Sequence, residues 1–590
     1  MEETQEPHNR KVSFPSWAQL RMLGKHLSAF EKKLLGLLAI VALSSSVIFL
    51  TLYVKYYAEK VPAYTGTYVE GVVGQPQYIN PVLADTNDVN RDIVELVFSG
   101  LMAYDNEGKL RLDLARDYRI SEDGKIYTFY LREGVKWHDG ETLTVDDIIF
   151  TVKTVQDPRV KSHLALNWQG VGMEKINDYT LQFILKQPYA PFLETLTMGI
   201  LPQHIWGKIA LENIALSEYN LKPIGSGPFK FLDFQKETSG RIISYRLEQN
   251  SDYYVRRPYI NEIVFNFFDN EEKLLSAANA GSLQGISPSA LSIDSLKSIR
   301  GDIYYPYEIR SYNYFALFFN KEKNSLLDDI TVRKALLMAT NKDEMIEKTL
   351  HEHAGPANYP IPENLVPPPS DATPLPYSPE KAITLLEANG WKLGDGPYRK
   401  KTVEPKEKNK EKEELELAVE VVIPDIAELK EIGDILKSNW ESIGVKTDIR
   451  LITAKTKEGF QTLQQDVIRP RDYQILLFGH AFLSQPDLFS FWYSSQKKDP
   501  GLNFSLYENK EVDKLLEDIR KTTNDEQRTK KMQIAEKIIM DDVPAIFLYY
   551  PHYLYPVQKQ IKGINIHNLV LPPQRFDDVI NWYMATTYSF

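Results

Sequence analysis

The chain has 590 residues, with 69 Lys and Arg against 80 Asp and Glu, which gives a formal net charge of −11. At about 150 residues per domain this length predicts several folding units, and an acidic chain without a basic block is not typical of nucleic-acid binding. The sequence contains no Cys, which excludes disulfides, thiolate metal sites, cysteine nucleophiles and a cysteine-linked lipid anchor.

The first predicted element is a transmembrane helix at Leu34–Val54, which carries no charge over 21 residues. At about 1.5 Å per residue it spans roughly 31 Å, the thickness of a bilayer core. Six Lys or Arg against one acidic residue lie between Arg10 and Lys33. The positive-inside rule therefore places residues 1–33 in the cytoplasm and the domain after the helix outside, in a single-pass protein of the cell membrane.

A cleaved signal peptide is the alternative interpretation of this segment. Its apolar run is longer than the usual core of about 7–15 residues, which favours a retained anchor, but the sequence leaves cleavage open. Residues 55–64 are expected to form a short spacer between the membrane and the folded part.

Further along, Ile126–Arg132 alternates apolar and polar residues and predicts a strand. Thr144–Asp147 resembles a capping box, and the apolar residues that follow it predict a helix. Later segments predict further helices and two strands around the last helix: Val332–Ala339, Lys381–Ala388 and Ile432–Trp440 as helices, Leu415–Ile423 and Val445–Ile452 as strands. This mixture indicates an α/β fold with a mixed sheet in each of two large lobes.

Arg399–Glu414 contains 12 charged residues of both signs in 16 positions. Such a run predicts a solvated loop between strands.

Patterns for catalysis are missing from the sequence. It has no phosphate-binding loop of the G-x-x-x-x-G-K-[ST] type, no G-x-S-x-G elbow and no H-E-x-x-H helix. Ser494–Lys497 fits S-x-x-K but lacks the companion K-T-G, and the two histidines of His351–His353 indicate a surface loop rather than a metal site. We therefore expect a binding protein without catalytic residues, cofactor or metal, and not an enzyme.

The region from Leu114 to Ile148 carries a family signature. Its motifs are Leu114–Ala115, Ser121–Lys125, Tyr127–Gly140 (YTFYLREGVKWHDG) and Leu143–Ile148 (LTVDDI). They resemble the family-5 extracellular solute-binding proteins, which are the oligopeptide, dipeptide and nickel receptors of ABC importers. Further segments match the same family: Gln75–Pro81, Pro223–Phe229, Asn250–Tyr259, Phe319–Asn320, Val332–Ala335, Asn341–Glu344 and Tyr377–Trp391.

The resemblance implies a two-lobed type II periplasmic-binding-protein fold with an extra subdomain in lobe I, preceded by the transmembrane helix. Ligand would bind between the lobes, and closure of the cleft would present it to an ABC permease and its ATPase. The expected layout is lobe I at 65–86, 205–306 and 552–590, its subdomain at 87–204, and lobe II at 307–551.

The same resemblance suggests which residues contact the ligand. Candidates come from the first segment, from the start of lobe II and from the ligand loop: Tyr78, Asn80, Tyr312, Asn313, Tyr314, His480, Phe482, Gln485 and Asp487. Peptide receptors of this family hold the ligand's α-ammonium with an Asp three residues before the acidic member of a Glu-Pro or Asp-Pro pair. Here those positions are Phe482 and Gln485, so we expect no strong requirement for a free N-terminus, unless Asp487 takes over that role.

The function predicted from the sequence is a membrane-anchored extracellular receptor that delivers a peptide or peptide-like ligand to an ABC importer. A ligand sensor of the same fold without a transport role is one alternative. An anchored hydrolase is another, disfavoured by the missing catalytic patterns.

Overall fold

The computed structural model describes residues 16–17, 22, 27–57, 59–84, 87–288, 293–403, 413–454 and 457–589. The chain forms two compact units, one of residues 1–63 with 585–590 and the other of residues 64–584.

The first unit contains helix α2 (Ala29–Tyr57), and the predicted apolar segment Leu34–Val54 lies within it. Among the described residues α2 is the helix long and apolar enough to cross a membrane, over Ala29–Tyr53, although a signal sequence has the same properties. The Thr51 hydroxyl donates to the Ile48 carbonyl oxygen at 3.0 Å, so this polar group is satisfied inside the helix. Strand β1 (Glu59–Pro62) then pairs antiparallel with β24 (Thr586–Ser589).

In the second unit, thirteen strands of the described chain form one sheet. In order across the sheet the main path is β20 (Lys446–Thr453), β19 (Ala418–Asp425), β21 (Ile475–Ala481), β14 (Asn313–Phe319), β22 (Ala545–Gln558), β12 (Gly285–Ile286), β2 (Thr67–Val73), β11 (Glu262–Phe268), β10 (Ile242–Gln249) and β9 (Phe229–Lys236). Three more strands pair beside this path: β13 (Tyr304–Ser311), β15 (Ala354–Pro356) and β23 (Asn568–Leu569).

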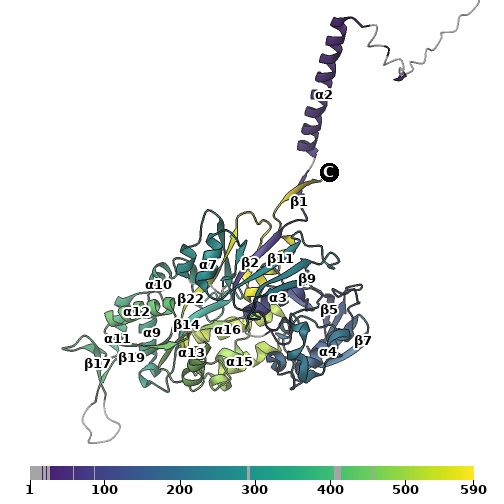
Figure 1. The fold of residues 1–590 in the computed structure, drawn as a ribbon. Coiled ribbons are helices and arrows are strands. Elements are labelled where there is room, and N and C mark those ends of the chain that lie inside the picture. The colour runs from purple at the N-terminus through teal and green to yellow at the C-terminus, as the bar shows by residue number, and fades with distance from the viewer. Residues whose placement is uncertain are drawn as a thin grey trace, which may run out of the picture. The chain divides into compact units, whose positions relative to one another are not determined.

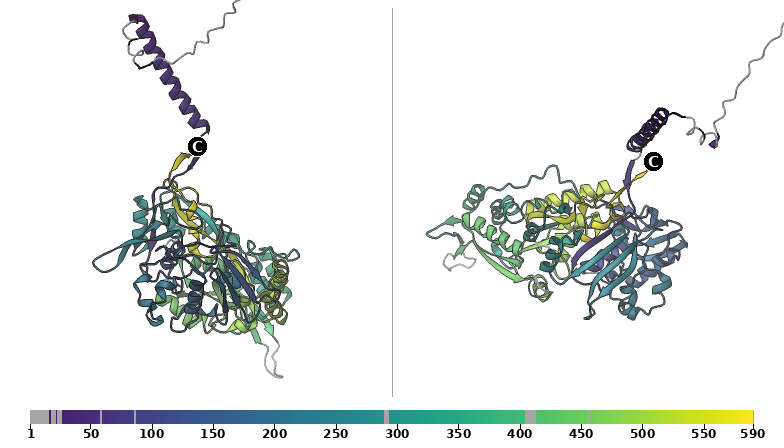
Figure 2. Two further views of the ribbon diagram at one scale, coloured as in Figure 1. Left: turned by 90° about the vertical axis from the view of Figure 1, so that its right-hand side faces the viewer. Right: turned by 45° about the horizontal axis from the view of Figure 1, so that its top comes forward.

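Strand β22 belongs to both halves of this sheet. Its first half pairs with β14 and β15, and its second half pairs with β13 and β12. We call the part built on β2 and β9–β13 lobe I, and the part built on β14, β15 and β19–β21 lobe II. In Figures 1 and 2 the yellow C-terminal part of the chain lies between the blue part of lobe I and the green part of lobe II. Both halves mix parallel and antiparallel pairs, as expected, but they are joined into one sheet.

A separate four-stranded antiparallel sheet forms the subdomain of lobe I. Its order is β5 (Ala115–Ile120), β6 (Ile126–Leu131), β8 (Thr180–Ile184) and β7 (Gly172–Asn177). The predicted strand is confirmed in β6, where Tyr127, Phe129 and Leu131 are buried. The predicted helix is confirmed in α4 (Val145–Gln156), and the Asp147 carboxylate accepts the Thr144 N–H at 2.9 Å.

The three helices predicted in lobe II are also present. They are α9 (Ile330–Met338), α11 (Pro379–Ala388) and α12 (Ala427–Ser442). As expected, α12 connects two strands, β19 and β20, which pair in parallel.

Two predictions in this region are wrong. Leu415–Ile423 is not one strand, because β18 (Glu413–Glu416) belongs to a small sheet with β16 (Lys392–Leu393) and β17 (Arg399–Val403), while β19 starts at Ala418 in the large sheet. The charged run Arg399–Glu414 is not entirely loop, because its two ends form β17 and β18, and the residues between 403 and 413 lie outside the described chain. Arg399 itself is buried, and its guanidinium donates to the carbonyl oxygens of Ile443 and Trp391.

The remaining elements lie around these sheets. They are α3 (Asp88–Val97), β3 (Met102–Tyr104), β4 (Leu110–Leu112), α5 (Phe192–Thr195), α6 (Gln203–Trp206), α7 (Glu271–Asn279), α8 (Ile293–Lys297), α10 (Lys342–Lys348), α13 (Lys457–Thr462), α14 (Phe489–Trp492), α15 (Lys510–Lys521) and α16 (Asp525–Asp542).

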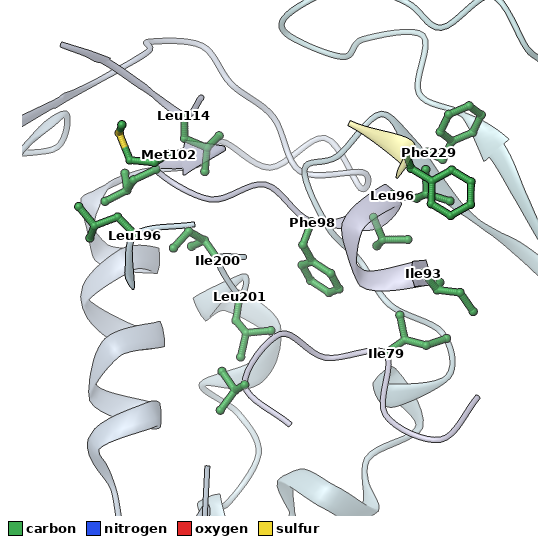
Figure 3. Packing of buried hydrophobic residues seen from close by; sticks show 14 of the residues in the cluster. Ile79, Ile93, Leu96, Phe98, Met102, Leu114, Leu196, Ile200, Leu201 and Phe229 are labelled. Carbon is green, nitrogen blue, oxygen red and sulfur yellow. The ribbon is translucent and has the colours of Figure 1, made fainter. Parts of the chain in front are cut away.

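The core of lobe I continues into its subdomain. Figure 3 shows Phe98, which follows α3, between Leu96 on one side and Ile200 with Leu201 on the other. These side chains are almost fully buried, so the end of α3 is fixed by apolar packing on both sides. This packing matters for function because α3 also forms one wall of the cavity described below.

Lobe II contains a buried carboxyl group with little hydrogen bonding. Glu536, on α16, is fully buried; its Oε1 accepts the Ile361 N–H at 3.2 Å, and its Oε2 has no hydrogen-bond partner within the described part of the chain. Burial raises the pKa of Glu536 to about 8 from an ordinary 4.5. Because the folded state then holds a proton that the unfolded state releases, stability falls as the pH rises through this interval.

We expect Glu536→Gln to flatten the pH dependence of the unfolding free energy between pH 5 and 8. The neutral amide keeps an acceptor for Ile361 and has no proton to lose. Chemical unfolding at several pH values measures the slope. Glu526→Gln is the matched control on the same helix, because Lys530 lowers the pKa of exposed Glu526 from 4.5 and places its titration below this window. Equal slopes for wild type and Glu536→Gln would contradict the assignment.

Candidate functional site

A cavity of about 710 Å³ lies between the core of lobe I and its subdomain. This volume is typical of a small-molecule or peptide site. Its walls come from α3, from β3, from the segment 194–199 and from the C-terminal segment 571–581, and lobe II contributes Leu483.

The lining of this cavity is acidic. The acidic residues are Glu95, Asp105, Asp113, Glu194, Asp577 and Asp578, and the Arg residues are Arg91 and Arg111. A concave surface with an excess of one charge concentrates counter-ions, so the cavity favours a positively charged ligand.

Two of these carboxyl groups interact directly. Glu95, on α3, and Asp577 are partly buried and lie within hydrogen-bonding reach of each other. Burial, and for Asp577 also the charge of Glu95, raises the pKa of each group above its ordinary value. A proton or another cation between the two carboxylates relieves their repulsion.

Asp113 forms the next part of the acidic wall. It is 5% exposed, and its carboxylate accepts the Tyr254 hydroxyl at 2.7 Å and lies 3.8 Å from the Arg111 guanidinium. Burial raises the pKa of Asp113, while Arg111 and Tyr254 act in the opposite direction. The Arg111 side chain also donates to the Tyr104 carbonyl oxygen at 2.8 Å, so it is already engaged by the protein.

Arg575 fixes the C-terminal wall of the cavity. Its fully buried guanidinium contacts Asp92 of α3 and lies 3.1 Å from Glu70 of β2, and it also donates to the Pro572 carbonyl oxygen at 3.1 Å. These contacts join the C-terminal segment to β2 and α3, which lie 505 and 483 positions earlier, and they hold Asp577 and Asp578 opposite α3.

The residues predicted to contact ligand lie elsewhere, since none of these nine described residues lines this cavity. In lobe I, the Tyr78 N–H donates to Asn90, and fully buried Asn80 accepts the Val82 N–H. Both hydrogen bonds stabilise the backbone between β2 and α3.

The candidates on β14 and β21, or directly beside these strands, are mostly buried in lobe II. The Tyr312 hydroxyl donates to the Glu107 carbonyl oxygen at 2.7 Å, and the Tyr314 hydroxyl lies 3.0 Å from His480 Nδ1. Burial lowers the pKa of His480 to about 3, so the imidazole is neutral. Phe482 packs against Tyr314, and Asn313 is half-buried with no hydrogen-bond partner for its Oδ1 in the described chain.

The last two candidates lie in the segment 482–487, which we call the 482–487 loop. Arg528 donates to the Gln485 side-chain oxygen. Arg520 binds both carboxylate oxygens of Asp487, with Nε at 3.1 and 3.0 Å. Asp487 is therefore already paired with a cation of the protein. Ligand contact by the nine residues stays a prediction.

Sequence reasoning missed the acidic cavity residues. Glu95, Asp113 and Asp577 carry no local motif, and 482 positions separate the first from the last. The tertiary fold brings them together, so no pattern along the sequence indicated them.

A two-lobed molecule with a ligand-sized cavity and a shared central strand has the form of a solute receptor. The family model of the bacterial extracellular solute-binding proteins, family 5, matches residues 109–501. The chain belongs to this family, and the predicted two-lobed periplasmic-binding-protein fold is confirmed. The family consists of substrate-binding proteins rather than enzymes.

Known proteins similar to this chain support the assignment. The oligopeptide-binding protein AppA of Bacillus subtilis (strain 168) is 28% identical over 541 residues, covering 89% of this chain and 92% of the relative. The structure of AppA from Bacillus subtilis in complex with a nonapeptide covers 89% of this chain and 100% of its own, with 25% identity and a TM-score of 0.65. The structure of NikZ from Campylobacter jejuni in complex with Ni(L-His) covers 88% of this chain and 99% of its own, with 26% identity and a TM-score of 0.67.

We expect Arg575→Met to destabilise the protein by about 3–5 kcal/mol, because it leaves the buried carboxylates of Glu70 and Asp92 without their cation. The midpoint of urea unfolding measures the effect. Arg300→Met is the control, since its ion pair with Asp302 is exposed and should contribute little to stability. Adding Glu70→Gln and Asp92→Asn to Arg575→Met should recover part of the loss. An Arg575→Met variant as stable as the control would contradict the role of Arg575.

Proposed function

We propose that this protein is a membrane-anchored extracellular receptor that captures a peptide or peptide-like ligand and delivers it to an ABC permease and its ATPase. Family membership and the oligopeptide-bound relative support the ligand class. The observation that carries the proposal is the cavity of about 710 Å³ between elements of lobe I, with Leu483 of lobe II at its wall. The protein has no catalytic role in this proposal.

The apolar helix α2 supports the anchor, with residues 1–33 in the cytoplasm and the large domain outside the cell. We further propose the predicted layout, with lobe I at 65–86, 205–306 and 552–590, its subdomain at 87–204 and lobe II at 307–551. The pairing of β22 with strands of both lobes supports a hinge at this strand.

The acidic lining supports a cationic ligand. We expect the exported domain, residues 59–590, to bind a tetrapeptide Ala-Lys-Ala-Ala at least tenfold more tightly than Ala-Glu-Ala-Ala, with Ala-Gln-Ala-Ala between them. Calorimetry at two salt concentrations measures the difference, which should shrink at the higher concentration. Asp578→Asn should reduce the discrimination, and Asp302→Asn, outside the cavity, should not. Absence of binding by all three peptides would contradict the peptide proposal.

The pairing of Asp487 with Arg520 supports a receptor that does not depend on the ligand's N-terminus. We expect N-acetylation of the lysine peptide to weaken binding less than replacement of its Lys by Gln does, because the 482–487 loop offers no unpaired carboxylate for an ammonium group. The same calorimetric assay makes the comparison. Loss of most of the binding on acetylation, together with a comparable loss in Asp487→Asn, would show that Asp487 holds the ammonium group.

A further inference from the structure

A carboxylate of the lobe I subdomain contacts the 482–487 loop of lobe II. Glu194, on α5, accepts hydrogen bonds from the Ser484 hydroxyl and from the Gln485 backbone N–H, each at 2.5 Å and both at Oε1. Its Oε2 accepts the hydroxyl of Tyr104, on β3. One side chain thus joins three segments, and two of the three donors belong to the opposite lobe.

These bonds are shielded from water. Glu194 and Tyr104 are each 5% exposed. A buried carboxylate is costly without donors, and hydrogen bonds to a charged or partly charged acceptor inside a protein are stronger than in solvent. Separating the lobes would leave Glu194 without its two lobe II donors, so the contact favours the closed arrangement.

The loop that meets Glu194 is itself fixed to lobe II. The Phe482 N–H donates to the Tyr312 carbonyl oxygen at 3.1 Å, and Asp487 pairs with Arg520. A second contact lies close by, where the Ala190 N–H of the subdomain donates to the Arg520 carbonyl oxygen at 2.8 Å. Movement of the loop alone therefore cannot release Glu194 without breaking other bonds of lobe II.

We propose that Glu194 is a positioning residue that latches the lobe I subdomain to the 482–487 loop and so populates the closed cleft through the protein's own contacts. Every donor and acceptor in the latch belongs to the chain, so the latch does not depend on any ligand contact. Glu194 and Leu483 also line the cavity, and the latch therefore forms part of the wall that a ligand must pass or displace. This role extends beyond the proposed transport function and does not rest on it.

The absence of Cys allows a direct test with two introduced thiols. Glu174→Cys in the subdomain and Lys430→Cys in lobe II place spin labels at exposed positions outside the latch. Pulsed electron–electron double resonance on the full-length protein in detergent then gives the distance distribution between the lobes, with no peptide in the sample. The result is therefore independent of whether the protein binds peptides.

We expect the labelled protein to show a major closed population, and Glu194→Ala to raise the ratio of open to closed molecules roughly tenfold, as loss of several buried hydrogen bonds implies. Glu194→Gln keeps an acceptor oxygen for the loop and should give a smaller rise. Glu133→Ala is the matched control, since Glu133 is an exposed residue of the subdomain 4.0 Å from Arg116.

Ser484→Ala removes one donor from the lobe II side and leaves Glu194 in place, so it keeps the test valid if Glu194→Ala does not fold. It should also shift the distribution toward open molecules. A distribution unchanged in both Glu194→Ala and Ser484→Ala, or one that is fully open in the unsubstituted protein, would overturn the proposal.

Discussion

Strand β22 is the constraint that links the two lobes, because its backbone hydrogen bonds belong to both halves of the large sheet. Residues 545–551 pair with β14 and β15, and residues 552–558 pair with β13 and β12. The register of β22 with β14 shifts between Phe315 and Ala316. Such an irregularity bends a strand locally, so the sheet can change its curvature there while the pairs on either side stay intact. The proposed hinge at β22 would therefore bend a continuous strand without breaking its pairing with either lobe.

The same connectivity explains how the cavity is assembled. After β22 the chain returns to lobe I, and Arg575 ties this return to β2 and α3 through two buried carboxylates. That ion pair places Asp577 against Glu95, two groups that repel each other when both are ionised. The ion pairs of Arg575 stabilise the fold, whereas the nearby Asp577 and Glu95 destabilise it when both are ionised. Such unfavourable charge pairs are typical of functional sites, where the surrounding structure compensates their energy.

Local patterns in the sequence were sufficient for elements whose stability is local. The alternation in β6 and the Asp147 cap of α4 were predictable because each depends on residues within one strand or one turn. Arg399 shows where this reasoning fails: a charged run indicated solvent, but carbonyl oxygens of distant residues satisfy its guanidinium in a buried position. Prediction of the acidic cavity from local patterns fails for the same reason, since Glu95 and Asp577 meet only through the tertiary fold. Local patterns indicated two mixed sheets in two lobes, and the resemblance to a family supplied the expected lobe boundaries and the extra subdomain.

The 482–487 loop connects these observations. At the two positions where the resemblance leads us to expect acidic residues, the chain has Phe482, which is buried, and Gln485, whose side chain is held by Arg528. Asp487 is held by Arg520, so all three side chains serve contacts within the protein. The negative charge that faces the cavity comes instead from lobe I, and one of those carboxylates, Glu194, also binds the backbone of the loop. A cationic ligand that reached Glu194 would compete with the loop donors for Oε1, so the proposed latch and the proposed recognition of a cation would oppose each other at this side chain.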